Sequence, residues 1–231
     1  MTGTLDGWTI AIDLDGTLVD TAPDLCGALN HVLQLKELAP VPLNEIRHMV
    51  GHGAKAMIRQ GLSWNGVGVD ERQIEDTLWP AFIDFYTAHI CDQSRVFPGA
   101  IEAMETLASR GAKLAICTNK AQGLAENVLD SLDLTTRMAA IVGADTASSK
   151  KPNAAHLYET IQAAGGTSER ALLIGDSDTD ERAARNAELP FIFVSFGYGE
   201  LTPDPLPSVI TVHDWSRVPT VVSEIAEGGT N

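Results

Sequence analysis

The stretch Ile12-Asp13-Leu14-Asp15-Gly16-Thr17-Leu18-Val19-Asp20 decides how the chain is interpreted. An apolar run, residues 8–12, precedes it and predicts a buried strand that ends in two carboxylates. An unpaired buried carboxylate is costly, so a cation or hydrogen-bond donors are expected beside it. Two interpretations follow. The acids either cap backbone N–H groups in a turn or form a metal and phosphoryl site.

Composition limits the classes of protein to which the chain can belong. It has 231 residues, of which 44% are hydrophobic, and a formal net charge of -15. The excess of acids argues against a nucleic-acid partner, because affinity for phosphates comes mainly from cations. The same charge repels small anionic substrates, so a local cation would have to hold one.

The chain also predicts a cytoplasmic location away from membranes. No run of 18 apolar residues is present, and the first residues lack the basic and apolar segments of a secretory signal. The three cysteines, Cys26, Cys91 and Cys117, form no CxxC pair. We expect them to be reduced thiols rather than a disulfide or zinc framework.

Short apolar runs alternate with helical patterns and predict a doubly wound α/β fold, a parallel sheet with helices on both faces. The predicted strands are 8–14, 113–117, 139–142, 171–174 and 191–196, with a further edge strand at 208–212. One predicted helix begins after Gly99, and four others cover 121–132, 154–164, 179–187 and 218–227.

Residues 21–95 interrupt this alternation. Their apolar residues recur with helical spacing, and no convincing strand is visible. We therefore expect a helical domain at 21–95, of a length that suits a four-helix bundle, inserted into a core of residues 1–20 and 96–231.

Ligands of open parallel sheets bind beyond the carboxyl ends of the strands. The residues that follow four of the predicted strands are Asp13 and Asp15, Thr118 and Asn119, the Lys150-Lys151-Pro152 segment, and 175–180 with Asp176 and Asp180. Carboxylates, a hydroxyl and a lysine thus meet at one edge of the sheet, which favours the metal and phosphoryl site.

These residue types suit phosphoryl transfer through a covalent intermediate. Mg²⁺ takes oxygen ligands, which Asp13 and Asp176 can supply. One of the two first-strand acids can attack phosphorus, and the other can protonate the leaving oxygen and activate water. Thr118 and Lys151 can hold the phosphoryl oxygens.

Other motif-based interpretations are weaker. The Asp176-x-Asp178-x-Asp180 pattern lacks the glycine and the final glutamate of a calcium loop. Neither GxxxxGK[ST] nor GxSxG occurs. By themselves, residues 51–53 and 197–199 are more typical of turns than of ligand contacts.

Together the DxDGT stretch, Thr118-Asn119, Lys151-Pro152 and the GDSxxD segment at 175–180 resemble the four motifs of the haloacid dehalogenase superfamily, in the same order. Further segments, such as Phe97-Pro98-Gly99 and Cys117-Thr118-Asn119-Lys120, are most similar to the bacterial phosphoglycolate phosphatases. The resemblance implies a Rossmann-like core and a Mg²⁺-dependent phosphatase of small phosphorylated metabolites such as 2-phosphoglycolate. It also allows a homo-oligomer.

The resemblance assigns roles residue by residue. Asp13 is the nucleophile and a metal ligand, and Asp15 is the general acid and base and gives a backbone oxygen to Mg²⁺. Asp176 ligates the metal, and Asp180 supports it without direct contact or pairs with Lys151. Lys151 neutralises the nucleophile and the phosphate.

Substrate contacts are implied in the same way. Thr118 and the backbone of Asn119 hold the phosphoryl group, and Gly16 lies beside it. The helical insertion corresponds to a cap domain, whose Gly51-His52-Gly53 loop becomes a substrate loop. Two positions depart from the family pattern, namely Asn153-Ala154 after the lysine motif, and Glu188, where a glycine is usual.

The residues present distinguish among the other reactions of the superfamily. A dehalogenase lacks an acid at the Asp15 position, which argues against that activity. Phosphonate hydrolysis needs a cap lysine, for which Lys36 and Lys55 are the candidates, although solvated lysines are the simpler interpretation. A sugar-phosphate mutase, or a phosphatase of another small metabolite, stays open. A non-catalytic protein is disfavoured because no catalytic residue is missing.

Overall fold

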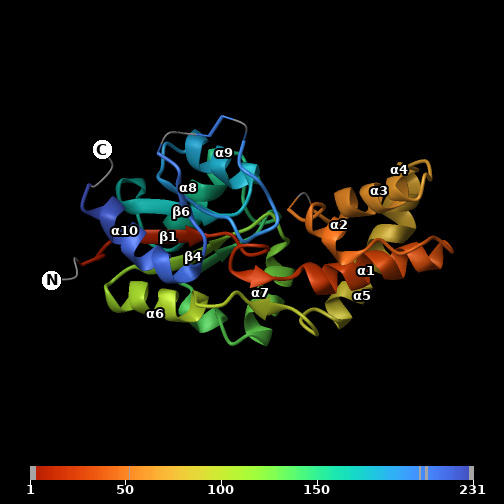
Figure 1. The fold of residues 1–231 in the computed structure, drawn as a ribbon, viewed down its shortest axis with the longest axis horizontal. Coiled ribbons are helices and arrows are strands. Elements are labelled where there is room, and N and C mark those ends of the chain that lie inside the picture. The colour runs from red at the N-terminus through yellow and green to blue at the C-terminus, as the bar shows by residue number, and fades with distance from the viewer. Residues whose placement is uncertain (1–3, 52, 203, 206–207, 229–231) are drawn as a thin grey trace.

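The computed structural model of the chain describes residues 4–51, 53–202, 204–205 and 208–228. Figure 1 shows two lobes, one built around a sheet and the other from helices α1 to α5. The helical lobe joins the sheet lobe through two adjacent chain segments, so its residues are inserted into the sheet lobe. No helix in the described part of the chain is long and apolar enough to cross a bilayer.

Six parallel strands form the main sheet, in the order β5-β4-β1-β6-β7-β8. The strands are β1 (Thr9–Ile12), β4 (Lys113–Cys117), β5 (Ala140–Val142), β6 (Ala171–Gly175), β7 (Phe191–Val194) and β8 (Ile210–Val212). Strand β1 lies between β4 and β6, which both follow it in sequence, so the strand order reverses there. Such a reversal opens a crevice at the carboxyl ends of the strands.

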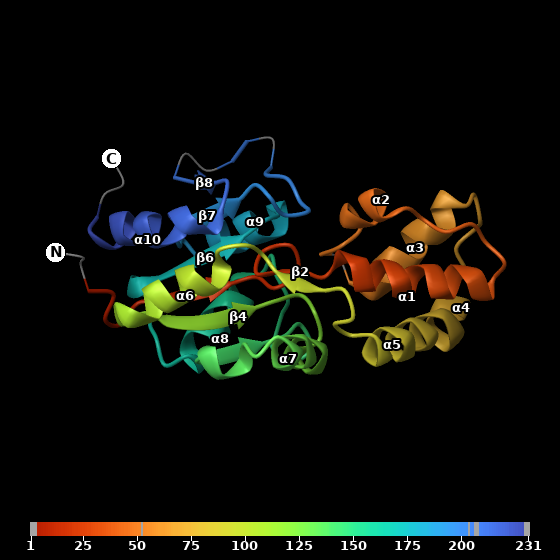
Figure 2. The same cartoon turned by 60° about the horizontal axis from the view of Figure 1, so that its bottom comes forward.

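Helices cover both faces of this sheet, as Figure 2 shows. They are α6 (Ala100–Ser109), α7 (Gln122–Ser131), α8 (Ala154–Ala163), α9 (Asp178–Asn186) and α10 (Val218–Ala226). Side chains alternate between the two faces. Ile10 and Ile12 of β1 pack with α6, α7 and α10, whereas Ala11 packs with α8 and α9. The predicted α/β class and most predicted elements are therefore confirmed.

The helical lobe has a separate apolar core. Its helices are α1 (Ala22–Leu35), α2 (Leu43–Arg47), α3 (Ala54–Trp64), α4 (Glu71–Gln73) and α5 (Trp79–Ala88), with a π-helical turn η1 (Ile74–Leu78) between the last two. Segments α4, η1 and α5 run as one continuous helix. The π-helical turn ends two residues before Pro80. Pro80 has no backbone N–H to donate back into this turn, so the wider turn can accommodate the proline.

One feature of the connection was not expected from the sequence. A two-stranded antiparallel ribbon, β2 (Val19–Asp20) and β3 (Arg95–Val96), joins the two lobes. Each strand has only two residues, which is too short for a period-2 pattern to be detected. Three short 3₁₀ helices complete the sheet lobe: η2 (Thr135–Arg137), η3 (Ser168–Arg170) and η4 (Trp215–Arg217).

Candidate active site

The register of the sheet brings the expected site residues to one edge. Ile12 of β1 pairs with Ile116 of β4 and Ile174 of β6, so the three strands end at the same level. The backbone N–H of Asp13 continues this pairing and donates to the carbonyl of Ile174 at 2.9 Å. Consequently the residues that follow the three strands are neighbours, although about 160 positions separate the first from the last.

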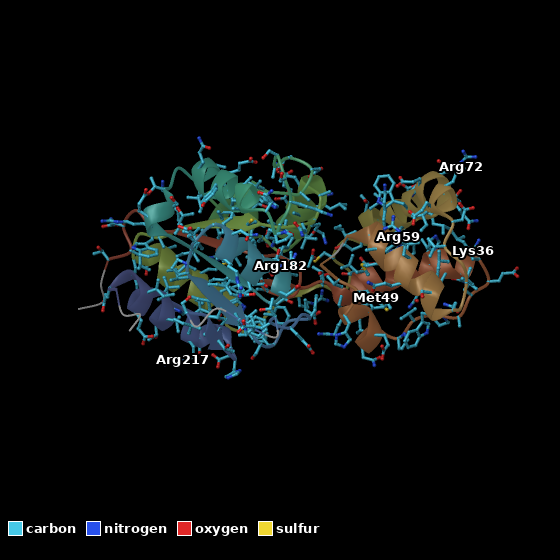
Figure 3. All side chains as sticks on the ribbon, turned by 90° about the horizontal axis from the view of Figure 1, so that it is seen from above. Lys36, Met49, Arg59, Arg72, Arg182 and Arg217 are labelled. Carbon is cyan, nitrogen blue, oxygen red and sulfur yellow. The ribbon has the colours of Figure 1, made fainter. Side chains whose placement is uncertain are left out.

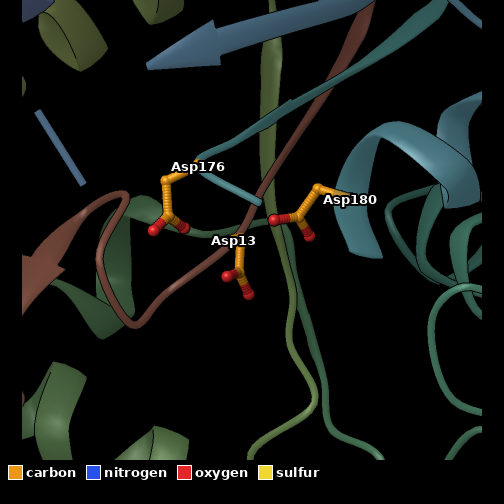
Figure 4. Close-up of side chains that lie close together, drawn as sticks. All are labelled: Asp13, Asp176 and Asp180. Atoms are coloured by element: carbon orange, nitrogen blue, oxygen red, sulfur yellow. The ribbon is translucent and has the colours of Figure 1, made fainter. Parts of the chain in front are cut away.

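Three carboxylates gather at this edge. Each of Asp13, Asp176 and Asp180 offers an oxygen that lies within 4.8 Å of the oxygens of the other two. Figure 4 shows the three side chains converging from the end of β1, the end of β6 and the start of α9. A set of hard oxygen donors at this spacing suits Mg²⁺, which prefers carboxylate ligands together with water.

Lys151 lies within the same cluster and is almost fully buried. Its Nζ donates to Oδ1 of Asp13 and to Oδ1 of Asp180, both at 2.7 Å. Against the opposing effect of burial, the charges of Asp13 and Asp180 raise the pKa of Lys151. The lysine is therefore a cation, and three carboxylates with one ammonium leave a formal excess of two negative charges.

Burial also changes the titration of the acids. It raises the pKa of Asp13 to about 8, opposed by Lys151 and reinforced by Asp180 and Asp176. It raises the pKa of Asp176 to about 6, with Asp180 adding to the rise. Desolvation and mutual repulsion both disfavour the charged forms, so a divalent cation among these carboxylates would relieve them.

Asp176 is held by neutral donors. Its Oδ1 accepts from the hydroxyl of Thr17 at 2.9 Å, and its Oδ2 accepts from the backbone N–H groups of Tyr198 at 2.7 Å and Gly199 at 3.2 Å. Gly16 has a φ of +87°, and a Cβ there would lie 2.5 Å from Oδ2 of Asp176. The glycine of the first motif is thus required by the close approach of Asp176.

Asp180 uses both of its oxygens within the protein. One accepts from Lys151, and the other accepts from the hydroxyl and the backbone N–H of Ser177, at 2.6 and 3.2 Å. Ser177 and Asp180 form a reciprocal capping box at the start of α9. The structure contains the expected contact of Asp180 with Lys151, and it also places Asp180 in the three-carboxylate cluster.

Asp15 lies outside the three-carboxylate cluster and faces the helical lobe. Its Oδ1 accepts from the hydroxyl of Thr21 at 2.5 Å and from Nζ of Lys120 at 2.8 Å. Lys120 also lies 4.8 Å from the centre of the Tyr86 ring, which belongs to α5. The sequence places Lys120 in the Cys117-Thr118-Asn119-Lys120 segment of the resemblance, but it was given no role in the predicted site.

Thr118 and Asn119 begin the loop after β4. The backbone N–H of Thr118 donates to Val142 at 3.1 Å, and the amide of Asn119 donates to the carbonyl of Lys151 at 3.1 Å. The other amide atom, Oδ1 of Asn119, is buried and has no hydrogen-bond partner among the described residues. Both residues line a cavity together with Asp13, Asp15 and Lys151.

This cavity, of about 170 Å³, lies between the two lobes. Gly51 and Gly53 line it, as expected for the proposed substrate loop, whereas His52 lies outside the described residues. The rest of the helical lobe contributes an apolar wall of Leu25, Val50, Ala54, Met57, Trp79, Phe82, Ile83 and Tyr86. A second cavity on the other side of Asp13 reaches Asp176, Arg47 and Tyr198.

Two further residues support the site, although neither was assigned a role in it from the sequence. His156 is fully buried, and burial together with the charge of Lys151 lowers its pKa to about 4. As a neutral ring it accepts from the backbone N–H of Lys151 through Nδ1 at 3.2 Å and donates through Nε2 to Val142 at 3.1 Å. It fixes the backbone that carries Lys151.

Tyr198 is the second of these residues. Beyond its backbone bond to Asp176, its hydroxyl donates to Asp20 at 2.5 Å and accepts from the N–H of Ala22 at 2.9 Å. The segment that we interpreted as a turn therefore connects Asp176 to the junction between the lobes.

The lysines considered for phosphonate hydrolysis lie elsewhere. Lys36 donates to Gln73 at 2.9 Å, at the end of the helical lobe remote from the sheet, as Figure 3 shows. Lys55 pairs with the exposed Glu75 at 2.5 Å. Neither lysine lines either of the two cavities.

Comparison with known proteins identifies the family. Residues 10–194 match the sequence profile described as haloacid dehalogenase-like hydrolase. The chain belongs to this family. The phosphoglycolate phosphatase of Caulobacter vibrioides is 45% identical over 93% of the chain and 90% of that relative. That of Agrobacterium fabrum is 41% identical over 92% and 91%.

Solved structures of haloacid dehalogenase-like hydrolases share the fold. A crystal structure from Haemophilus somnus, described as a predicted phosphoglycolate phosphatase, superposes with a TM-score of 0.83 at 25% identity. The match covers 94% of this chain and 98% of that one. The expected superfamily, its Rossmann-like core and its phosphatase class are thereby confirmed.

Proposed function

We propose that the chain is a Mg²⁺-dependent phosphatase that hydrolyses 2-phosphoglycolate through an aspartyl-phosphate intermediate. The hydrogen bonding of Asp13 carries the mechanism. Its Oδ1 is bonded to Lys151, and the hydrogen bonds of the described residues leave its Oδ2 free at the cavity. The substrate is inferred from two phosphoglycolate phosphatases to which this chain is 45% and 41% identical, over 93% and 92% of its length.

Asp13, Asp176 and the backbone carbonyl of Asp15 would hold the metal ion. The three-carboxylate cluster fits a divalent cation by donor chemistry and by its two excess negative charges. When bound, Mg²⁺ would supply positive charge that neutralises nucleophile and phosphoryl oxygens. Asp180 belongs to the same cluster, and its hydrogen bonds to Lys151 and Ser177 would position the lysine and the start of α9 beside the ion.

In the first half-reaction, Oδ2 of Asp13 attacks phosphorus, the ester P–O bond breaks, and Asp15 gives a proton to the leaving oxygen. In the second, Asp15 takes a proton from water, the oxygen of which attacks the same phosphorus and releases Asp13. Lys151, Thr118 and the N–H of Asn119 hold the phosphoryl oxygens while charge is redistributed.

The helical lobe, residues 21–95, acts in this proposal as a cap that encloses the leaving group. Its apolar wall would exclude water from the site, and Gly51 and Gly53 lie where the cap meets the catalytic edge. The substrate phosphate would then lie between the charged edge of the sheet and the apolar wall.

The mechanism is tested with Asp13→Asn, and Asp84→Asn on the exposed face of α5 serves as a charge-matched control. With Mg²⁺ and 2-phosphoglycolate, D13N is expected to lose at least about 10³-fold in kcat, because the amide is not a nucleophile. Acid-quenched wild-type protein should retain label from radiolabelled substrate, and D13N should retain none. Wild-type turnover by D13N, or isomerised sugar phosphate as the main product of the wild type, would refute the proposal.

A further inference from the structure

The proposed catalytic residues do not explain how the apolar wall of the cavity could hold a substrate with a second negative charge. A phosphorylated acid has a second negative charge on its leaving group, but the part of the cavity beyond Asp15 is lined almost entirely by apolar side chains. Burying an unpaired carboxylate there would be costly. A substrate of this kind therefore needs a cation at the boundary between the charged edge and the apolar wall.

Among the described residues, two lysines line this cavity, Lys151 and Lys120. Within the described residues, Lys151 donates to Asp13 and Asp180, at the phosphoryl end. Lys120 lies farther along, with its Nζ 2.8 Å from Asp15, and its side chain is 6% exposed. An ammonium has three N–H donors. The contact with Asp15 uses one, so Lys120 can donate to a second acceptor.

The position of Lys120 is fixed by its backbone. Its N–H donates to the hydroxyl of Thr118 at 3.1 Å, and its carbonyl accepts from the N–H of Ala144 at 3.0 Å. Gly143 makes this possible, because a Cβ at that position would lie 2.8 Å from the same carbonyl. The ammonium is thus held at a defined distance from the phosphoryl site.

Tyr86 of α5 gives an independent observation. Its hydroxyl oxygen is buried close enough to the ammonium of Lys120 to interact with it, but it makes no well-formed hydrogen bond with any described residue. The side chain lines the same cavity beside Lys120. A buried hydroxyl without a partner costs stability unless a ligand satisfies it. A carboxylate could accept from both the ammonium and this O–H.

We infer that Lys120 and Tyr86 form the subsite for the carboxylate of the substrate, so that the enzyme selects short phosphorylated carboxylic acids. This inference rests on the proposed function. In such an acid, one methylene separates the carboxylate from the ester oxygen that Asp15 protonates, which places the carboxylate next to the partner of Asp15. Sugar phosphates are disfavoured, because the apolar wall leaves their hydroxyl groups without partners.

The test compares 2-phosphoglycolate with 2-hydroxyethyl phosphate, which has the same ester but no carboxylate. In Lys120→Met, kcat/KM for 2-phosphoglycolate is expected to fall about 10²-fold more than kcat/KM for 2-hydroxyethyl phosphate, which lacks the carboxylate. Lys120→Arg should restore part of this selectivity. Lys113→Met, at the opposite end of β4, is the charge-matched control and should not change the ratio.

Tyr86→Phe separates recognition from folding, because it removes a hydroxyl that makes no well-formed hydrogen bond within the described part of the chain. It should lower kcat/KM for 2-phosphoglycolate selectively, by about 5- to 10-fold, without lowering the melting temperature. The inference is refuted if K120M lowers kcat/KM equally for both esters, or if neither K120M nor Y86F changes the ratio of the two kcat/KM values. Lys120 and Tyr86 would then only support Asp15. Failure of the wild type to hydrolyse 2-phosphoglycolate would instead refute the proposed function before any substitution is made.

Discussion

Replacement of Gly16 by alanine tests whether the first motif is built around Asp176. Gly16 has a φ of +87°, and a Cβ on it would lie 2.5 Å from Oδ2 of Asp176 and 2.8 Å from Cδ2 of Tyr198. Because carbon and oxygen atoms approach to roughly 3.3 Å, the carboxylate oxygen would have to move by about 0.8 Å. That movement would weaken its bonds from the N–H groups of Tyr198 and Gly199.

The cost follows from these contacts. A left-handed backbone costs a non-glycine residue about 1–2 kcal/mol. The weakened bonds to a charged group add about 1.5–3 kcal/mol, so unfolding free energy should fall by roughly 3–5 kcal/mol. A ligand displaced by almost 1 Å should also reduce turnover by about 10²-fold and raise the Mg²⁺ concentration needed for half-maximal activity.

Gly66→Ala is the matched control. Gly66 also has a positive φ, +68°, but an added Cβ meets nothing within 4 Å. Both substitutions stiffen the unfolded chain equally, so their difference isolates the contact with Asp176. Urea denaturation measures the difference in unfolding free energy between the two variants, and a Mg²⁺ titration of activity measures the difference in their Mg²⁺ midpoints. The reasoning is wrong if G16A and G66A have the same stability and the same Mg²⁺ midpoint.

Two further predictions concern stability. Glu188 has a φ of +56° directly after α9, so Glu188→Gly should stabilise the protein by about 0.5–1 kcal/mol, whereas Glu227→Gly, at a φ of -82°, should destabilise it in the same thermal melts. A lower melting temperature for E188G than for the wild type would contradict this. The pKa values of Asp13, about 8, and Asp176, about 6, lie above the usual 3.8, so the folded protein without metal holds more protons than the unfolded chain between these values. Its stability should therefore be highest near pH 4 and fall as pH rises to 8, by about 3 kcal/mol from Asp176 alone. Mg²⁺ should abolish most of this fall, and a metal-free protein that becomes more stable over the same range would contradict the prediction.

The sheet was predictable because its signals are local. Residues 114–117 form a short apolar run, and the strand found there, Lys113–Cys117, has the predicted bounds. The location of the site followed from a topological rule, since parallel strands deliver their carboxyl ends to one edge. The β2–β3 ribbon could not be inferred in this way, because two-residue strands carry no periodic pattern.

The apolar wall of the cavity shows a different limit. Phe82 and Tyr86 have the same helical spacing as the core residues of the helical lobe, and both are almost fully buried. Periodicity assigns them to a buried face but cannot tell a face that packs on another helix from one that lines a cavity. The position of Lys120 beside Tyr86 depends on how the two lobes meet, which is a property of the assembled fold.

The support of Asp176 illustrates why the closest contacts of a site are the hardest to predict. Its donors lie 22 and 23 positions after it and 159 positions before it, and two of the three are backbone N–H groups. Any residue except proline supplies a backbone N–H, so residue type reveals nothing about such a donor. The glycines around it do carry a signal. A Cβ on Gly197 would lie 2.2 Å from the Cβ of Asp176, and one on Gly199 would lie 2.7 Å from its carbonyl. The two glycines that flank Tyr198 therefore let the backbone pack directly against Asp176, and residues 197–199 form part of the site rather than an isolated turn.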